Sequence, residues 1–265
     1  MRKTILLTLA LALGAGSSAG AGDPAALELM NEMHKAYYYA GDGGSAKVTM
    51  VLTDKKGRTR ERAFWMLRTD IEDMGDQNYY TYFIKPADVR KTAFLVHKKA
   101  EGNDDRWLYI PSVDLVKRIA ADDRRASFVG SDFTYEDVSG RLPSLDEHEF
   151  MATEERDGKP LTVVKSIPKE AKTAEYAWRK TWIDAETKLP VQEEYYNDKE
   201  EAIRRFEVGT VLTIEGYPTA VERIMTDLEK NHTTVISFDE VTYEATLKPS
   251  QYTERILKSP PAQVR

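Results

Sequence analysis

After an N-terminal apolar run, the chain continues with a segment whose hydrophobic positions follow a helical period. Apolar and aromatic side chains recur three or four residues apart, at Leu27, Met30, His34 and Tyr37. Charged residues occupy other positions, so the segment has one apolar face. Asp23 and Pro24 precede it, and this pair is typical of a helix N-cap and a first helical residue. Gly41 follows it and favours a helix end. The pattern predicts an amphipathic helix over residues 24–40 that packs against an apolar surface.

From Lys47 onwards the hydrophobic period changes to two. Val48, Met50 and Leu52 alternate with polar side chains, and Lys56-Gly57 supplies a turn. Further apolar and β-branched runs, separated by Gly, Pro, Asn and Asp, predict strands at 64–67, 79–84, 92–97, 107–110, 161–167, 176–184, 190–196, 201–208, 219–227 and 232–243. The sequence therefore predicts a mainly β protein of the α+β class, with about eleven strands that mostly form an antiparallel meander.

The stretch from Trp107 to Val138 carries the most local detail. It predicts a strand, a hairpin, a second strand and then a capped turn at residues 130–132. In this interpretation, the charged tip at residues 122–125 reverses the chain. We find no nucleophile motif, metal-ligand cluster or phosphate loop in the stretch, so the pattern indicates structure or binding rather than catalysis.

Few helices accompany these strands. Tyr252 and Ile256, four residues apart, predict a short closing helix, and residues 140–160 predict either a helix or an ordered loop. Together with the N-terminal helix these segments would not cover a sheet of eleven strands, one face of which has to be buried. We therefore expect a curved half-barrel sheet with a few helices over its open side, enclosing an apolar hollow.

Large apolar and aromatic residues on the strands are the candidates for lining this hollow, because Met and wide rings suit a cavity that accepts varied chains. The candidate lipid-binding residues are Met50, Leu52, Phe64, Met66, Tyr80, Tyr82, Phe94, Trp107, Tyr109, Trp178 and Trp182. Residues of these types in strands usually belong to an ordinary sheet core. The sequence also leaves open which of the two alternating faces turns inward.

Composition and the N-terminal segment indicate where the protein acts. Residues 1–21 combine Arg2 and Lys3 with an apolar core and small residues, as in a cleaved secretion signal. The remaining residues, 22–265, are expected to form one exported domain. The chain has no cysteine, so we expect no disulfide and no lipid attached to the protein itself. Removing the two positive charges of the signal takes the net charge from −6 to about −8, which disfavours nucleic-acid binding.

Several ordered blocks of the chain together resemble one known family. They are Ala36-Tyr37-Tyr38, Pro86-Ala87-Asp88-Val89, Trp107-Leu108-Tyr109-Ile110-Pro111, Arg118-Ile119 and Gly130-Ser131-Asp132-Phe133-Thr134-Tyr135-Glu136-Asp137. This set resembles the LolA-like family of outer-membrane lipoprotein-sorting proteins. The resemblance implies an antiparallel half-barrel with helices across its mouth. It also implies a periplasmic carrier that binds acyl chains of lipids or lipoproteins.

Such a carrier would take its cargo from an inner-membrane exporter toward an outer-membrane acceptor. The resemblance implies no catalytic residue and no cofactor, so we do not expect an enzyme, and we expect a monomer. In a second hypothesis the protein has the same fold but does not transport its ligand. It would be a periplasmic sensor or transporter adaptor that binds a lipid or lipoprotein. This hypothesis is favoured by a basic cluster in an otherwise acidic chain. The docking candidates in this cluster are Lys117, Arg118, Arg124 and Arg125.

A third hypothesis, an exported hydrolase, has little support. The chain lacks a GxSxG motif, and its four histidines do not have metal-binding spacing. Gly130-Ser131-Asp132 is expected to form a turn in which a side chain bonds the backbone.

Overall fold

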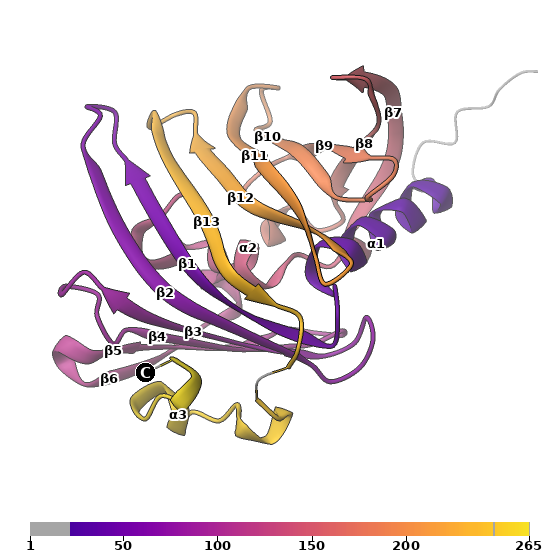
Figure 1. Ribbon diagram of the computed structural model, residues 1–265. Helices are drawn as coiled ribbons and strands as arrows, with labels where there is room; N and C mark the ends of the chain where they lie inside the picture. Colours follow the sequence, from indigo (N-terminus) through magenta and orange to yellow (C-terminus); the bar gives the residue numbers. More distant parts are fainter. Residues whose placement is uncertain (1–21, 246, 265) are drawn as a thin grey trace, which may run out of the picture.

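Thirteen antiparallel strands form one curved, open sheet in the computed structural model, which describes residues 22–245 and 247–264 (Figure 1). The strands are β1 Gly43–Thr53, β2 Thr59–Asp70, β3 Gln77–Lys85, β4 Ala93–Lys98, β5 Asp105–Ile110, β6 Leu115–Ile119, β7 Asp146–Arg156, β8 Lys159–Pro168, β9 Trp178–Asp184, β10 Pro190–Tyr196, β11 Ala202–Ile214, β12 Tyr217–Asp227 and β13 His232–Thr242. The α-helices of the described ranges are α1 Pro24–Tyr38, α2 Tyr135–Ser139 and α3 Arg255–Lys258. The predicted mainly β half-barrel is confirmed. The predicted signal, residues 1–21, lies outside the described residues.

The strand order fixes how the chain crosses the sheet. It runs β6-β5-β4-β3-β2-β1-β13-β12-β11-β10-β9-β8-β7, so two meanders meet where β1 pairs with β13. Strands β6 and β7 follow each other in the chain but form opposite edges of the sheet. Residues 120–145, hereafter the inner segment, therefore have to cross from one rim of the half-barrel to the other.

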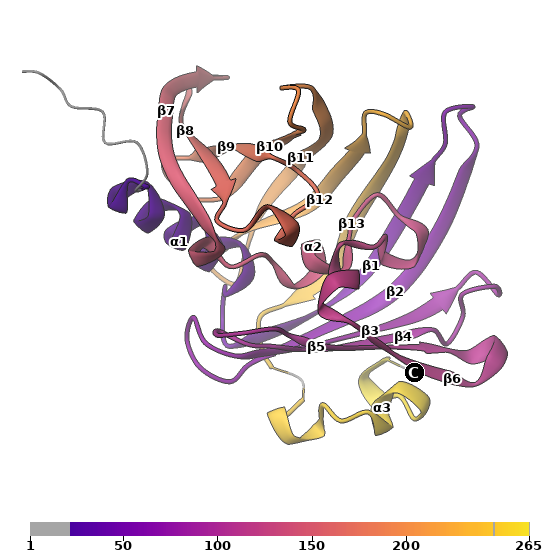
Figure 2. The same ribbon diagram turned by 180° about the vertical axis from the view of Figure 1, so that it is seen from behind.

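The inner segment lies inside the curve of the sheet (Figure 2). It consists of α2 and the short 3₁₀ turns Ala121–Arg125, Phe128–Gly130 and Pro143–Leu145. Gly140 ends α2 with a φ of +83°, and a Cβ at this position would lie 2.8 Å from the ring of Tyr38 on α1. Both the dihedral angle and the close approach require glycine.

Aromatic side chains of the inner segment fill the concave face of the first meander. The Phe128 ring centroid lies 6.2 Å from that of Phe64, 6.0 Å from that of Phe83 and 5.5 Å from that of Phe94. Tyr135 adds a contact at 5.0 Å to Phe94. All five side chains are buried. The chain itself therefore occupies much of the hollow that the strand count predicts.

The opposite face of the first meander is covered by the C-terminal segment, residues 247–264 (Figure 1). Tyr80 and Leu95 of the sheet pack there with Tyr252 and Leu257. The Tyr80 hydroxyl donates to the backbone carbonyl of Ile256 at 2.9 Å. The predicted closing helix is confirmed as α3, and its two buried side chains complete this second core.

Helix α1 forms as predicted, although it is two residues shorter at its C-terminal end. The Asp23 side chain accepts from the Ala25 amide at 2.8 Å, so it caps the helix, and Pro24 is the first helical residue. Met30 and the neighbouring apolar residues of α1 pack on Val164 of β8 and Ile183 of β9. None of the helices among the described residues is both long and apolar enough to cross a membrane.

Two local predictions are wrong. Residues 140–145 are loop and a 3₁₀ turn, but residues 146–160 belong to the strand hairpin β7–β8 and not to a helix or loop. β7 is an edge strand whose residues beyond His148 are nearly all exposed, so its sequence lacks the apolar alternation by which strands are recognised. The hairpin between β5 and β6 turns at Pro111–Asp114, where Asp114 has a left-handed φ of +46°. Residues 122–125 instead belong to the inner segment, where Arg124 and Arg125 donate to the loop before β9.

Candidate functional site

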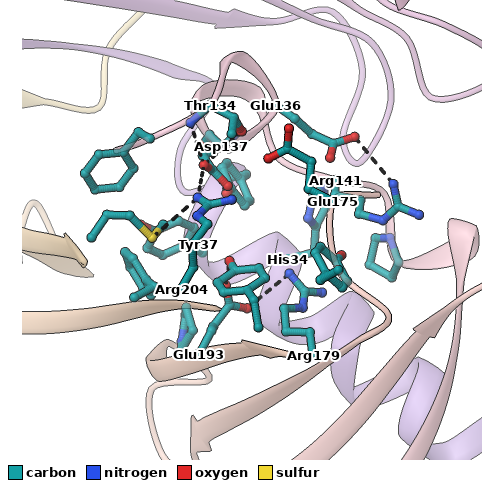
Figure 3. A pocket seen from close by; sticks show the side chains of 18 of the residues that line it. His34, Tyr37, Thr134, Glu136, Asp137, Arg141, Glu175, Arg179, Glu193 and Arg204 are labelled. Carbon is teal, nitrogen blue, oxygen red and sulfur yellow. Dashed lines mark hydrogen bonds and ion pairs between the residues drawn. The ribbon is translucent and has the colours of Figure 1, made fainter. Parts of the chain in front are cut away.

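A polar pocket opens between α1, the inner segment and strands β9–β12 (Figure 3). It holds about 800 Å³ of empty space, counting the solvent at its mouth. Charged side chains of both signs line it, namely Arg125, Arg141, Arg179, Arg204, Glu136, Asp137, Glu175 and Glu193. Because arginines and carboxylates are equal in number, the lining is balanced in formal charge.

The register of the strands brings the charged side chains of the sheet together. Tyr195 on β10 is the direct partner of Arg179 on β9 and of Arg204 on β11. Direct partners in antiparallel strands point to the same face. The two guanidinium carbons lie 6.0 Å and 4.9 Å from the centre of the Tyr195 ring, so a cation borders the ring on each side.

Carboxylates hold these arginines in place. Glu193 accepts a hydrogen bond from the Tyr195 hydroxyl at 2.6 Å, and its other oxygen lies 3.2 Å from Arg179 Nη1. Asp137 of the inner segment accepts from Arg204 Nη2 at 2.6 Å (Figure 3). This last pair links the inner segment to β11, in the second meander.

A second set of ion pairs anchors the end of the inner segment. Arg141 Nη2 donates to Asp146 at the start of β7 at 2.7 Å, and both side chains are almost fully buried. Glu136 lies 3.5 Å from Arg141 Nη1 and 3.1 Å from Arg124 Nε. Breaking a buried pair of this kind is costly, because it leaves an uncompensated charge.

Burial and nearby charges shift the pKa values of these groups in opposite directions. Burial raises the pKa of Glu136, and the nearby guanidiniums of Arg141 and Arg124 offset this only in part. For Arg179, burial alone would lower the pKa. The surrounding groups, with the carboxylate of Glu193 first among them, together outweigh it and hold the pKa of Arg179 well above its ordinary value. The arginine therefore stays charged inside the pocket.

Tyr176 lines the same pocket and is only 9% exposed. Its ring packs edge-on against Tyr195, with the centroids 5.1 Å apart. Its hydroxyl is buried and has no hydrogen-bond partner among the described residues. Burial also raises the pKa of Tyr176, so the hydroxyl keeps its proton.

A second space, hereafter the groove, lies on the other side of the end of α1. It holds about 620 Å³ of empty space with its open mouth. Met66, Val138, Phe238 and Val241 are among its apolar lining residues, and Arg68 and Arg223 are its charged ones. No carboxylate side chain is among its described lining residues. Tyr37 and Tyr38 line both the groove and the polar pocket.

The structure distributes the predicted lipid-binding residues over several surfaces. Met50, Leu52, Phe64 and Phe94 belong to the core on the concave face, and Met66 packs at its edge and lines the groove. On the opposite face, the C-terminal segment and its surroundings contact Tyr80, Tyr82, Trp107 and Tyr109. Trp178 stacks on Tyr196 at 3.9 Å, and Trp182 packs with Leu161 and Val163. The structure thus brings the first five together and separates the other six from them.

The four predicted docking residues are also not one patch. Lys117 and Arg118 are exposed on the edge strand β6, where Arg118 pairs with Asp105. Arg124 donates to the Thr173 carbonyl at 3.0 Å, and Arg125 donates to the Ala174 carbonyl at 3.1 Å. The latter two therefore tie the inner segment to the loop before β9.

The predicted turn at residues 130–132 has structural contacts. The Ser131 hydroxyl donates to the Phe128 carbonyl at 2.8 Å. Asp132 instead bonds to side chains of β13, with the Thr234 hydroxyl donating at 2.6 Å and His232 Nδ1 at 2.8 Å. Among residues 22–245 and 247–264, no group of three or more His, Asp or Glu residues is arranged to hold a metal ion.

Sequence analysis missed the charged lining of the polar pocket. Arg179, Glu193 and Arg204 each occupy an inward position of a strand, where the next residues on the same face are Thr181, Tyr195 and Phe206. A charged residue among the apolar positions on the buried face of a strand is the signal that could have identified these three residues, because a buried charge needs a partner.

Comparison with known proteins agrees with this architecture. A family model described as "-like: Uncharacterized protein" matches residues 75–259, most of the chain. A domain described as an outer membrane lipoprotein-sorting protein from Vibrio parahaemolyticus is similar at 24% identity, over 88% of this chain and 98% of that one, with a TM-score of 0.81. The chain belongs to the family that this model describes, and it has the LolA-like fold of these solved structures.

Two further solved structures share the LolA-like fold. A DUF1329 family protein from Desulfovibrio piger has 23% identity and a TM-score of 0.82, over 90% of this chain and 100% of that one. A LolA superfamily protein from Nitrosomonas europaea has 17% identity and a TM-score of 0.67, over 87% and 98%. None of the curated proteins compared matches the chain.

Proposed function

We propose that this LolA-like protein is a periplasmic carrier of lipid or lipoprotein acyl chains. It would receive them from an inner-membrane exporter and pass them toward an outer-membrane acceptor. The observation that carries the proposal is the inner segment: the apolar concave face is covered by a crossing segment of short turns and not by a second sheet. The similarity to a lipoprotein-sorting domain and to a LolA superfamily protein supports it.

The inner segment is a cover that an acyl chain would replace. Phe128, Phe133 and Tyr135 place their rings on the concave face and are buried there. Burying three such side chains contributes roughly 5–9 kcal/mol. About ten methylenes of an acyl chain would contribute about 8 kcal/mol in the same place. Because the two contributions are similar, exchange of the cover for cargo would be reversible, as a carrier requires.

The groove offers the acyl chain a way to the concave face. Met66 and Val138 line the groove and also pack against the concave core. Val138 belongs to α2, so a chain that enters the groove meets the inner segment first. A methionine at this position suits the entry of varied chains, because it is flexible and polarizable.

The first experiment asks whether the protein holds lipid. The protein is purified from its native compartment and extracted with organic solvent, and the extract is analysed by mass spectrometry. Binding of a fluorescent acyl probe is then compared between Met66→Glu and Leu212→Glu. Leu212 is 53% exposed and lines neither space, so it is the matched control. We expect Met66→Glu to weaken probe binding at least about fivefold, because a carboxylate replaces an apolar side chain that lines the groove.

The absence of lipid in the extract, together with no probe binding by the wild type, would contradict the proposal. A second experiment separates a carrier from a sensor or adaptor. Donor and acceptor vesicles are mixed with the protein, and transfer of a labelled lipid is followed over time. A carrier accelerates transfer in proportion to its concentration, whereas a sensor binds lipid and leaves the transfer rate unchanged.

A further inference from the structure

The polar pocket contains hydrogen-bond donors that the protein does not use. The Tyr176 hydroxyl, Arg179 Nε and Arg204 Nε are buried and have no hydrogen-bond partner among the described residues. Leaving a buried donor unpaired is unfavourable, so native proteins rarely do it without a reason. Three such donors in side chains that line one pocket indicate a ligand rich in acceptor oxygens.

The carboxylates that face these donors are already occupied. Glu193 accepts from Tyr195 and Thr181 and pairs with Arg179. Asp137 accepts from Arg204 and also receives both the amide and the hydroxyl of Thr134. The free hydrogen-bonding capacity of this part of the pocket therefore lies with its donors.

One carboxylate of the pocket lacks such partners. Glu175 is exposed, lines the pocket and makes no hydrogen bond or ion pair with any described side chain. It is the residue directly before Tyr176, and both side chains line the same pocket. A cationic substituent on the ligand would find its counter-charge there.

We propose that the polar pocket binds the headgroup of an amine-bearing phospholipid. The phosphate accepts hydrogen bonds from Tyr176 and Arg179, and the ammonium group pairs with Glu175. Arginine guanidiniums match phosphate oxygens in geometry as well as in charge. The proposal of a phosphate site depends only on the unused donors. The proposal that this phosphate belongs to a lipid rests on the function proposed above.

The position of the pocket suits an amphiphilic ligand. Tyr37 and Tyr38 form a wall shared by the polar pocket and the groove. A headgroup in the polar pocket thus lies next to the apolar space that an acyl chain would enter. Arg223 packs on the Tyr37 ring at 4.3 Å and lines the groove, so it supports this wall from the groove side.

The test measures binding of four probes to the full-length mature protein by competition with a fluorescent lipid. The probes are short-chain phosphatidylethanolamine, short-chain phosphatidylglycerol, a fatty acid and inorganic phosphate. The variants are Tyr176→Phe and Glu175→Gln. Neither removes a hydrogen bond within the described protein, so we expect both to keep the melting temperature of the wild type.

A matched control uses another tyrosine of the same pocket. Tyr195→Phe also removes one hydroxyl, but this hydroxyl is bonded to Glu193 at 2.6 Å. It should lower the melting temperature and leave phospholipid binding within about twofold of the wild type, because a hydrogen bond already made inside the protein is not available to the ligand.

We expect Tyr176→Phe to weaken binding of both phospholipids about tenfold, the usual effect of one hydrogen bond to a charged group. Glu175→Gln should remove the preference for the ethanolamine headgroup. Neither variant should change fatty-acid binding. Equal loss of phospholipid and fatty acid in Tyr176→Phe, or unchanged phospholipid binding, overturns the inference.

The remaining outcomes separate this inference from the proposed function. Fatty-acid binding without any preference for phospholipid overturns the inference and leaves the carrier function standing. Tyr176-dependent binding of inorganic phosphate without lipid binding supports the phosphate site, but it overturns both the lipid source and the carrier function. No binding of any probe overturns both.

Discussion

Lys98 shows how much a single buried group departs from its ordinary chemistry. Its side chain is 1% exposed, and its amine lies 3.1 Å from His34 Nε2 and 4.9 Å from the centre of the Tyr39 ring. Burial lowers the pKa of Lys98 to about 7, against the opposing influence of the more distant Asp104 and other charges. Burial likewise lowers the pKa of His34 well below its ordinary value.

These shifts predict how stability depends on pH. The unfolded chain binds a proton at Lys98 up to a pH of about 10.5, whereas the folded chain releases it near pH 7. Since the unfolded state binds more protons between these values, the free energy of unfolding rises with pH there, by roughly 1 kcal/mol per pH unit. Urea unfolding at about pH 7.5, 8.25 and 9, all between these two pKa values, measures this slope.

The matched variants are Lys98→Met and Lys117→Met. The first removes the buried amine, so the slope should disappear. Lys117 is exposed on β6, and its replacement should leave the slope as in the wild type. A wild-type stability that falls between about pH 7.5 and 9 would contradict the assignment of this slope to Lys98. Such a fall requires a group whose pKa is raised by folding.

Individual residues were predictable only where their type matched their surroundings. Phe64 and Phe94 are apolar residues in strands, and they are buried. Lys98 and Arg179 also lie at inward positions, but a charged side chain is ordinarily assigned to the solvent face. Their partners are distant in the chain: Arg204 finds Asp137 across the half-barrel. Such pairings depend on the register of the whole sheet, which no local pattern contains.

At the scale of elements, α2 is too short to be stable alone, and Asp137 supports it in two ways. Asp137 accepts from the Thr134 amide at 2.7 Å and completes a capping box at the start of the helix. It also pairs with Arg204, whose side chain is only 13% exposed. The position of the inner segment therefore depends strongly on one carboxylate.

We expect Asp137→Asn to lower the free energy of unfolding by about 3–5 kcal/mol, because Arg204 would be left charged and unpaired. Arg205 is the next residue on β11 and pairs with Glu194 on the other face of the sheet. Arg205→Gln is therefore the control, and it should cost less than about 1 kcal/mol. Chemical denaturation measures both. Equal costs in the two variants would show that Asp137 does not hold the segment.

Elements were predictable where one face is buried and the other is not. Strands such as β1 and β10 alternate regularly and were found from their pattern. β7 was missed because Phe150 and Met151 are both exposed and no alternation remains. The inner segment was missed as a cover because Phe128, Phe133 and Tyr135 lie in short turns, where spacing carries no period.

At the scale of the whole molecule, uptake of an acyl chain should free the inner segment and leave the sheet intact. Hydrogen bonds such as Phe128 N–H to Phe133 C=O, at 2.7 Å, would open when the rings leave the concave face. Hydrogen exchange at residues 126–139 should accelerate when lipid is bound, while β1 and β13 keep their protection. Slower exchange of the inner segment in the lipid-bound protein would contradict displacement of this cover.

The half-barrel as a whole was predictable from the excess of strands over helices. The sequence did not predict that a segment of the chain itself fills the hollow. The order of strands places β6 and β7 at opposite rims, so the connection between them has to cross the opening. Which strands form the rims depends on the pairing of β1 with β13, a contact between nearly opposite ends of the chain. Only the assembled sheet shows that the hollow already contains part of the protein.

The rim-to-rim crossing also means that a single proteolytic cut within residues 120–145 would divide the molecule into two complementary halves. The first half would keep α1, whose Met30 packs on Val164 of the second. The second half would keep α3, whose Leu257 packs in one core with Tyr80 of the first. The β1–β13 ladder also joins the two halves, so each half would contribute contacts that hold the other in place. Co-expression of the two fragments should therefore reassemble the protein without a peptide bond between them.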